Sequence, residues 1–126
     1  MSRIGDRLHQ YGVTRKEKQL QALIIHDIEL LPETTSEQFE KFVTTRDYVE
    51  CANFDCIRSF VVVRADESGR AYRELIQVTD MDAFITATKT ERFAELEKDF
   101  SALARITGEE TTYSTVGTGY VAGGVE

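Results

Sequence analysis

Residues 74–84, Glu-Leu-Ile-Gln-Val-Thr-Asp-Met-Asp-Ala-Phe, pass from a strand into a helix and decide how the chain folds. The first half is rich in residues that favour strands, namely Leu75, Ile76 and Val78. Thr79 and Asp80 then offer side-chain oxygens to the free N–H groups of a starting helix. Glu74 and Gln77 place polar groups inside the strand. If these polar groups are buried, they indicate a catalytic or binding role. If they lie on the open face of an antiparallel sheet, they simply face solvent. Both interpretations stand at this point.

Composition restricts the class of protein. A chain of 126 residues forms one domain around one core. The net charge of −7, without clustered Lys or Arg, argues against nucleic acid and against anionic membrane surfaces as partners. No apolar run approaches the ~20 residues of a membrane span, and the N-terminus lacks the apolar segment of a signal peptide. We therefore expect a cytoplasmic protein.

Cofactor and metal sites are not indicated. Cys51 and Cys56 alone form no ligand cluster, and the two histidines lie far apart, so neither a structural zinc site nor any other metal site is expected. The glycines at 117 and 119 have no helix after them, which argues against a phosphate-binding loop. Neither histidine has a nucleophile partner recognisable in the sequence. The sequence therefore predicts no cofactor and no metal, and leaves acid–base chemistry as the available mechanism.

Hydrophobic periodicity and turn residues divide the chain into alternating elements. The expected elements are strand 21–31, helix 36–52, strand 56–64, strand 71–78, short helix 81–88, helix 91–104 and strand 109–116. Residues 1–20 are interpreted as an N-terminal arm and residues 117–126 as a Gly-rich C-terminal tail, with the domain at 21–116 between them.

The order β-α-β-β-α-β predicts an α+β fold of the ferredoxin-like class. In this fold both main helices cover one face of a four-stranded antiparallel sheet, and the first and third strands lie side by side at its centre. The first two strands are apolar on both sides, so the uncovered face also carries apolar groups. Monomers seldom expose a patch of that kind, so we expect a homodimer with two sheets packed face to face.

The hairpin at 66–69 sets a provisional register for the second and third strands. If Ala65 and Arg70 close the turn, Phe60 lies opposite Leu75 and Val61 lies opposite Glu74. A slip of one residue exchanges the two faces of the strand.

Three segments carry a resemblance to a known family. They are Arg-Glu-Leu-Ile-Gln-Val-Thr-Asp-Met-Asp-Ala-Phe at 73–84, Ile-Ile-His-Asp-Ile-Glu-Leu at 24–30 and Ile-Arg-Ser-Phe-Val-Val at 57–62. Over residues 21–116 the chain resembles the RedY-like (HapK-like) proteins of the dimeric α+β barrel superfamily, which are associated with prodiginine and related heterocyclic pigment pathways. The resemblance implies a small dimer that works on aromatic intermediates of secondary metabolism, and it leaves the reaction open.

The candidate catalytic residues are His26 and Glu74. His26 stands in an apolar row of the first strand, where an imidazole exchanges a proton near neutral pH; the plainer interpretation is a core histidine with one hydrogen bond. Asp47 is a further acid–base candidate, late in the first helix. The expected walls of the substrate site are Phe39, Phe42, Tyr48 and Phe60.

We therefore expect a cofactor-independent enzyme of aromatic natural-product biosynthesis. It promotes cyclisation, condensation or proton transfer on an indole- or pyrrole-type intermediate. Two alternatives remain: a cofactor-free monooxygenase of the same superfamily, and a non-catalytic protein that binds and shields a reactive intermediate.

Overall fold

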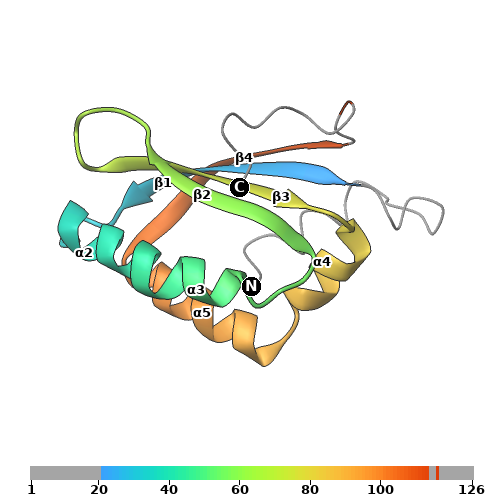
Figure 1. Cartoon of the computed structure of the whole chain (residues 1–126). Helices are drawn as coiled ribbons and strands as arrows, with labels where there is room; N and C mark the ends of the chain where they lie inside the picture. The colour runs from blue at the N-terminus through green and yellow to red at the C-terminus, as the bar shows by residue number, and fades with distance from the viewer. Residues whose placement is uncertain (1–20, 114–115, 117–126) are drawn as a thin grey trace, which may run out of the picture.

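The computed structural model describes residues 21–113 and 116. Its elements in chain order are β1 (Ala22–Leu30), α2 (Ser36–Phe42), the π-helical turn η2 (Val43–Asp47), α3 (Tyr48–Cys51), β2 (Ile57–Arg64), β3 (Ala71–Val78), α4 (Met81–Ala87), α5 (Glu91–Ser101) and β4 (Ala104–Tyr113) (Figure 1). The expected arm at 1–20 and tail at 117–126 lie outside the described residues, as do positions 114 and 115.

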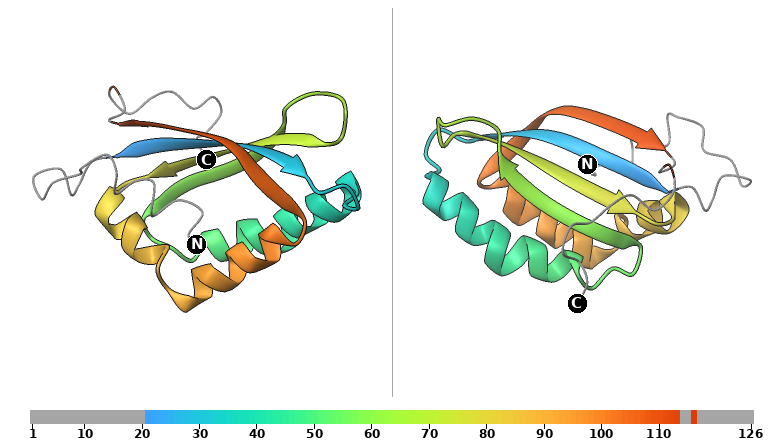
Figure 2. Two further views of the ribbon diagram at one scale, coloured as in Figure 1. Left: turned by 180° about the vertical axis from the view of Figure 1, so that it is seen from behind. Right: turned by 45° about the horizontal axis from the view of Figure 1, so that its top comes forward.

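The described elements form two layers. The strands make one antiparallel sheet in the order β2-β3-β1-β4, so β1 and β3 lie side by side at the centre as expected. All four helices lie on one side of this sheet, and no described element covers the other side (Figures 1 and 2). The structure therefore confirms the ferredoxin-like α+β fold. Among the described residues, no helix is long and apolar enough to cross a membrane.

The helix starts follow the local signals of the sequence. Thr35 caps α2, Asp80 caps α4 and Thr90 caps α5, each through a side-chain oxygen that accepts a backbone N–H. At the first of these starts the backbone N–H of Thr35 also donates a hydrogen bond to the side-chain oxygen of Gln38, which completes the expected capping box. Each of these caps joins residues three positions apart, so the helix starts could be predicted from the local sequence.

The long helix predicted at 36–52 contains a π-helical turn that sequence reasoning missed. Phe39, Val43, Asp47 and Cys51 are all buried, although each follows the last by four residues. A straight α-helix would rotate each successive member of such a series by about 40° away from the core. The wider winding of the π-helical turn offsets this drift, and it keeps the carboxylate of Asp47 directed inward.

The predicted boundaries of the last helix and strand were wrong. The helix ends at Ser101, not at residue 104, and β4 begins at Ala104 instead of residue 109. Pairing with β1 decides this boundary, because Leu30 pairs with Ala104. Hydrogen bonds to the central strand stabilise the extended conformation there, and they join residues that are far apart in the sequence.

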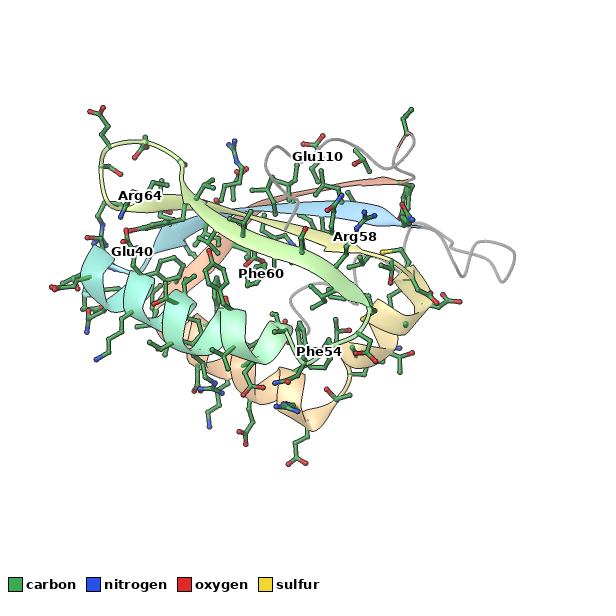
Figure 3. The ribbon with its side chains drawn as sticks, viewed as in Figure 1. Glu40, Phe54, Arg58, Phe60, Arg64 and Glu110 are labelled. Carbon is green, nitrogen blue, oxygen red and sulfur yellow. The ribbon has the colours of Figure 1, made fainter. Side chains whose placement is uncertain are left out.

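The predicted register of β2 on β3 was also wrong, by one residue. Phe60 pairs with Ile76, and Val62 pairs with Glu74. The register shifts between Ile57 and Ser59, so the strand pairs differently on the two sides of that point. Phe60 consequently points toward the helices (Figure 3).

Candidate functional site

Four side chains, one from each strand, form a row across the helix-covered face of the sheet. From one sheet edge to the other, the row reads Val62, Glu74, His26 and Glu109. Directly paired residues of antiparallel strands project to the same side, so these side chains are neighbours. His26 and Glu74, the two predicted catalytic residues, are both 0 % exposed. The structure therefore brings them together in the interior.

Hydrogen bonds join the three polar members of this row. Nδ1 of His26 lies 2.6 Å from Oε2 of Glu74, and Nε2 lies 3.2 Å from Oε2 of Glu109. The imidazole is therefore held between two carboxyl groups, one on each ring nitrogen. A histidine held at both nitrogens has a fixed ring plane.

The geometry also limits the protonation of the row. A carboxylate only accepts hydrogen bonds, whereas a neutral imidazole has one N–H and cannot donate to both neighbours. Two hydrogen bonds therefore need two shared protons. Either an imidazolium lies between two carboxylates, or a neutral imidazole lies beside one protonated carboxyl group. The row carries a single net negative charge in both cases.

The polar row divides the hydrophobic core in two. One apolar cluster packs sheet residues against α4, and its largest members include Ile24, Ile76, Met81 and Phe84. The other packs sheet residues against α2 and α5, and its members include Ile28, Phe39, Tyr72 and Phe100. The row at His26 thus lies in apolar surroundings, where electrostatic interactions are stronger than in water.

This arrangement does not suit a metal ion. The carboxylates of Glu74 and Glu109 lie on opposite nitrogens of one ring, so they cannot converge on a single ion. Within residues 21–113 and 116, no group of three or more His, Cys, Asp or Glu side chains could hold a metal. The row consists of three titratable side chains joined by hydrogen bonds.

Sequence reasoning missed Glu109 as a site residue, because it placed the start of the last strand there. A signal was present in Gly108, which interrupts a run of strand-forming residues. Glycine inside a strand marks a bulge or a close approach, and a Cβ at this position would lie 2.8 Å from Oδ2 of Asp27. The register of β4 on β1 shifts beside this pair, which sets Glu109 opposite His26.

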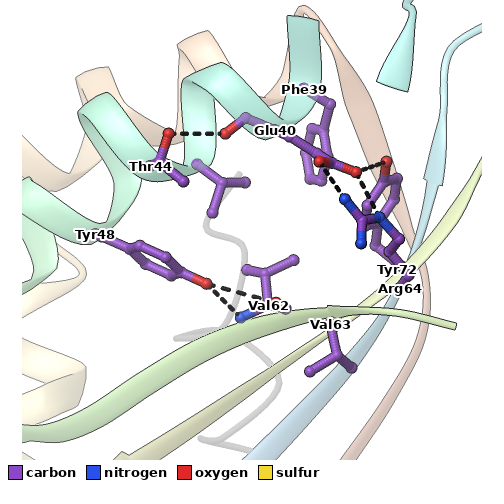
Figure 4. A pocket seen from close by; sticks show the side chains of 9 residues that line it. Phe39, Glu40, Thr44, Tyr48, Val62, Val63, Arg64 and Tyr72 are labelled. Atoms are coloured by element: carbon purple, nitrogen blue, oxygen red, sulfur yellow. Dashed lines mark hydrogen bonds and ion pairs between the residues drawn. The ribbon is translucent and has the colours of Figure 1, made fainter. Parts of the chain in front are cut away.

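A pocket of about 370 Å³ opens beside the row, between the first helix and the edge strand β2 (Figure 4). It is lined by Phe39, Glu40, Val43, Thr44, Tyr48, Val62, Val63, Arg64 and Tyr72. Val62 is at once a wall of this pocket and the cross-strand neighbour of Glu74. The pocket therefore lies one side chain away from the buried carboxyl group.

A fixed anion forms the polar wall of the pocket. Glu40 accepts two hydrogen bonds from Arg64, at 2.9 and 2.7 Å, and a third from the hydroxyl of Tyr72 at 2.8 Å. The hydrogen bond from Arg64, followed by that from Tyr72, holds the pKa of the Glu40 carboxyl below its usual range. Burial and the hydrogen bond to Glu40 raise the pKa of Tyr72 to about 12, so its hydroxyl remains a donor at neutral pH.

Tyr48 separates this pocket from a second one of about 180 Å³, which is lined by residues that include Phe60. The hydroxyl of Tyr48 accepts the backbone N–H of Val62 at 2.9 Å, and its ring meets that of Phe60 edge to face at 5.4 Å. The ring is therefore held against β2 by contacts with Val62 and Phe60. Tyr48 is the lining residue that the two pockets share.

The predicted wall residues divide between these spaces. Phe39 and Tyr48 line the larger pocket, and Phe60 lines the smaller one. Phe42 lies elsewhere, in an open groove beside α5 with its ring 6.4 Å from that of Phe100. The structure thus places three of the four predicted aromatic residues at these two pockets, with Tyr48 common to both.

Comparison with known proteins assigns the family. The family model described as REDY-like protein HapK matches residues 22–116. The crystal structure of HapK from Hahella chejuensis shares 33% sequence identity at a TM-score of 0.70, covering 81% of this chain and 99% of HapK. The chain belongs to the HapK family. The resemblance found in the sequence is thereby confirmed, and HapK itself matches over almost its whole length.

More distant structures share the fold of the HapK family. SnoaB, a cofactor-independent oxygenase from Streptomyces nogalater, is 19% identical at a TM-score of 0.61, with 76% of this chain and 92% of SnoaB covered. A protein from Methanosarcina mazei is 13% identical at a TM-score of 0.59, with 80% and 97% covered. No curated protein gives a significant match. One fold thus joins the HapK family to an oxygenase that needs no cofactor.

Proposed function

We propose that the protein is a cofactor-independent enzyme that removes a proton from a small aromatic heterocycle. The observation that carries this proposal is the buried Val62–Glu74–His26–Glu109 row, which sets a carboxyl group directly behind the wall of a pocket of suitable size. The family resemblance suggests a substrate of the indole or pyrrole type. Once deprotonated, such a substrate can cyclise, condense with a second molecule or regain a proton at another atom.

Glu74 is the proposed base, and His26 orients it and shares its proton. Glu74 is fully buried, so we propose that the Tyr48 side chain leaves the backbone of Val62 when a ring binds, and that the two pockets then join into one slot beside Glu74. In the joined slot the ring would lie along β2, against Phe39 on one side and Phe60 on the other. A positioned base in such a site contributes about 10²- to 10⁴-fold to the rate of proton transfer.

Deuterium exchange tests this function directly. Oxindole is a planar N–H heterocycle with an acidic C–H bond at C3, and NMR in D₂O follows the replacement of that hydrogen. We expect the protein to exchange the C3 hydrogen under argon at least about 100-fold faster than an equal concentration of free imidazole. A rate of C3 hydrogen exchange no higher than that with free imidazole would contradict the proposed acid–base function. Binding without exchange would support the alternative of a shielding protein.

The second candidate is a cofactor-free monooxygenase, favoured by the fold shared with SnoaB. The chemistry starts at the same step: a substrate CH₂ group loses a proton, and the carbanion supplies the electrons that reduce O₂. One oxygen atom then enters the product as a ketone and the other leaves as water. Consumption of one O₂ for each oxidised product would assign this reaction, whereas exchange that is equally fast under air and argon assigns acid–base chemistry alone.

We also propose that the functional unit is a homodimer formed through the uncovered sheet face. The apolar side chains of that face form a continuous group: Leu23, Ile25, Val61, Val63 and Leu75. Leu75 is its centre, because it pairs with Ile25 on one side and Val61 on the other. Two of the group, Val61 and Val63, are 45% and 42% exposed, which is typical of an interface between subunits.

Leu75→Glu is therefore expected to convert the dimer into a monomer. The substitution places a carboxylate at the centre of each apolar face, where two copies would bury like charges against each other. Analytical ultracentrifugation at micromolar concentration measures the change. Ala94→Glu, which adds the same charge on the exposed side of α5, should stay dimeric. A wild-type protein with the mass of one chain would exclude the dimer.

A further inference from the structure

Glu109 occupies the end of the polar row that lies farthest from the pocket. It belongs to β4, one edge strand of the sheet, whereas the pocket opens at β2, the opposite edge. Its side chain is 8% exposed, while those of Glu74 and His26 are 0% exposed. Of the three hydrogen-bonded groups, Glu109 is therefore the one that reaches solvent, and proton removal at Glu74 does not require a carboxyl group at this position.

We propose that the row is a proton relay across the sheet, with Glu109 as its outer end. The inference rests on the proposed function, because the proton it carries is the one that Glu74 takes from the substrate. The relay needs an unbroken chain of groups that both bind and release protons. The contacts of 2.6 and 3.2 Å on the two nitrogens of His26 provide that chain between two carboxyl groups.

The transfer balances as a set of linked steps. The substrate C–H proton moves to Oε1 of Glu74, while the proton shared between Oε2 and Nδ1 settles on Nδ1 of His26. The proton on Nε2 passes to Oε2 of Glu109, whose carboxyl group releases a proton to water. One proton has entered at the pocket and one has left at the β4 edge. When the product is protonated, the same steps run in reverse and restore the starting state.

A plain structural role for Glu109 makes the opposite prediction. If Glu109 merely anchors His26, its removal loosens the site and brings solvent closer to the ring. If Glu109 carries protons, its removal closes the route by which ring protons reach solvent. The two roles therefore differ in the sign of the change in proton exchange, which no stability measurement would report.

The experiment measures exchange of the His26 ring N–H protons with water, by NMR of protein labelled with ¹⁵N-histidine. His9→Gln in every sample leaves His26 as the sole histidine signal. We expect Glu109→Gln to slow this exchange at least tenfold, because an amide of the same shape does not take up and release protons at neutral pH. Glu110→Gln is the matched control: this neighbour pairs with Ile25, is exposed and points away from the helices (Figure 3). It should leave the exchange unchanged.

Exchange that is unchanged or faster in Glu109→Gln would overturn the relay. The measurement uses the protein without substrate, so it tests the relay even if the protein does not turn over oxindole. A failure of oxindole turnover would contradict the proposed function alone. Where the wild type does exchange oxindole, Glu109→Gln should lower the rate about tenfold, less than the loss of the base itself. Added imidazole should restore the rate, since a small buffer replaces the missing carrier.

Discussion

Glu74→Gln is expected to lower oxindole exchange at least about 100-fold, the scale of a lost general base. The amide oxygen can still accept the Nδ1–H of His26, so the side chain keeps its place and its neighbour. It cannot accept the substrate proton, because an amide is not basic at neutral pH. The substitution therefore separates proton transfer from folding and binding.

Three measurements make this result decisive. The dissociation constant for oxindole should change little in Glu74→Gln, and the far-ultraviolet circular dichroism spectrum should match that of the wild type. His26→Ala should also lower the rate, since it removes the group that orients Glu74. Full turnover in both variants would show that the polar groups are structural and that the catalytic assignment is wrong.

His26→Leu is expected to reduce the free energy of unfolding by about 3–5 kcal/mol, the usual cost of removing one partner of a buried acid–base pair. Leucine is close to histidine in size, so the loss arises mainly from the carboxyl group of Glu74, which stays buried without the imidazole. The urea midpoint, followed by circular dichroism, should fall by about 1 M or more. A cost of this size is a large share of the stability of a small domain.

The same two strands provide a matched control on their other face. Asp27 follows His26 and Arg73 precedes Glu74, and these two residues form an ion pair at 2.8 Å with side chains that are 50% and 51% exposed. Arg73→Ala should therefore cost less than about 1 kcal/mol when it is measured in the monomeric Leu75→Glu background, because water screens an exposed pair. The double variant His26→Leu/Glu74→Leu should recover much of the loss, since apolar residues of similar volume replace a buried pair without penalty. If His26→Leu and Arg73→Ala lowered the free energy of unfolding by equal amounts, the buried pair of His26 and Glu74 would not have the expected stabilising role.

Much of the fold could be predicted because its signals are local. Thr35, Asp80 and Thr90 report helix starts through their own side chains, and β3 was predicted with its observed bounds at Ala71 and Val78. The element order then led to the ferredoxin-like class and to adjacent central strands. The errors concern β4 and the register of β2, where long-range pairing and an irregular register set the outcome.

The candidate site could likewise be predicted only in part from the sequence. The alternation of residues along β1 placed His26 on an apolar face. The strand-forming residues around Glu74, followed by a turn, identified Glu74 as a polar residue inside β3. By itself, the sequence thus determined the element types, the family and these two residues as candidates. Only the tertiary structure decided that they meet, that Glu109 joins them and that a pocket lies behind Val62. The physical reason is that a shift of one residue in the pairing register moves every side chain of a strand to the opposite face of the sheet. The register is determined by the whole sheet and by the helices packed on it.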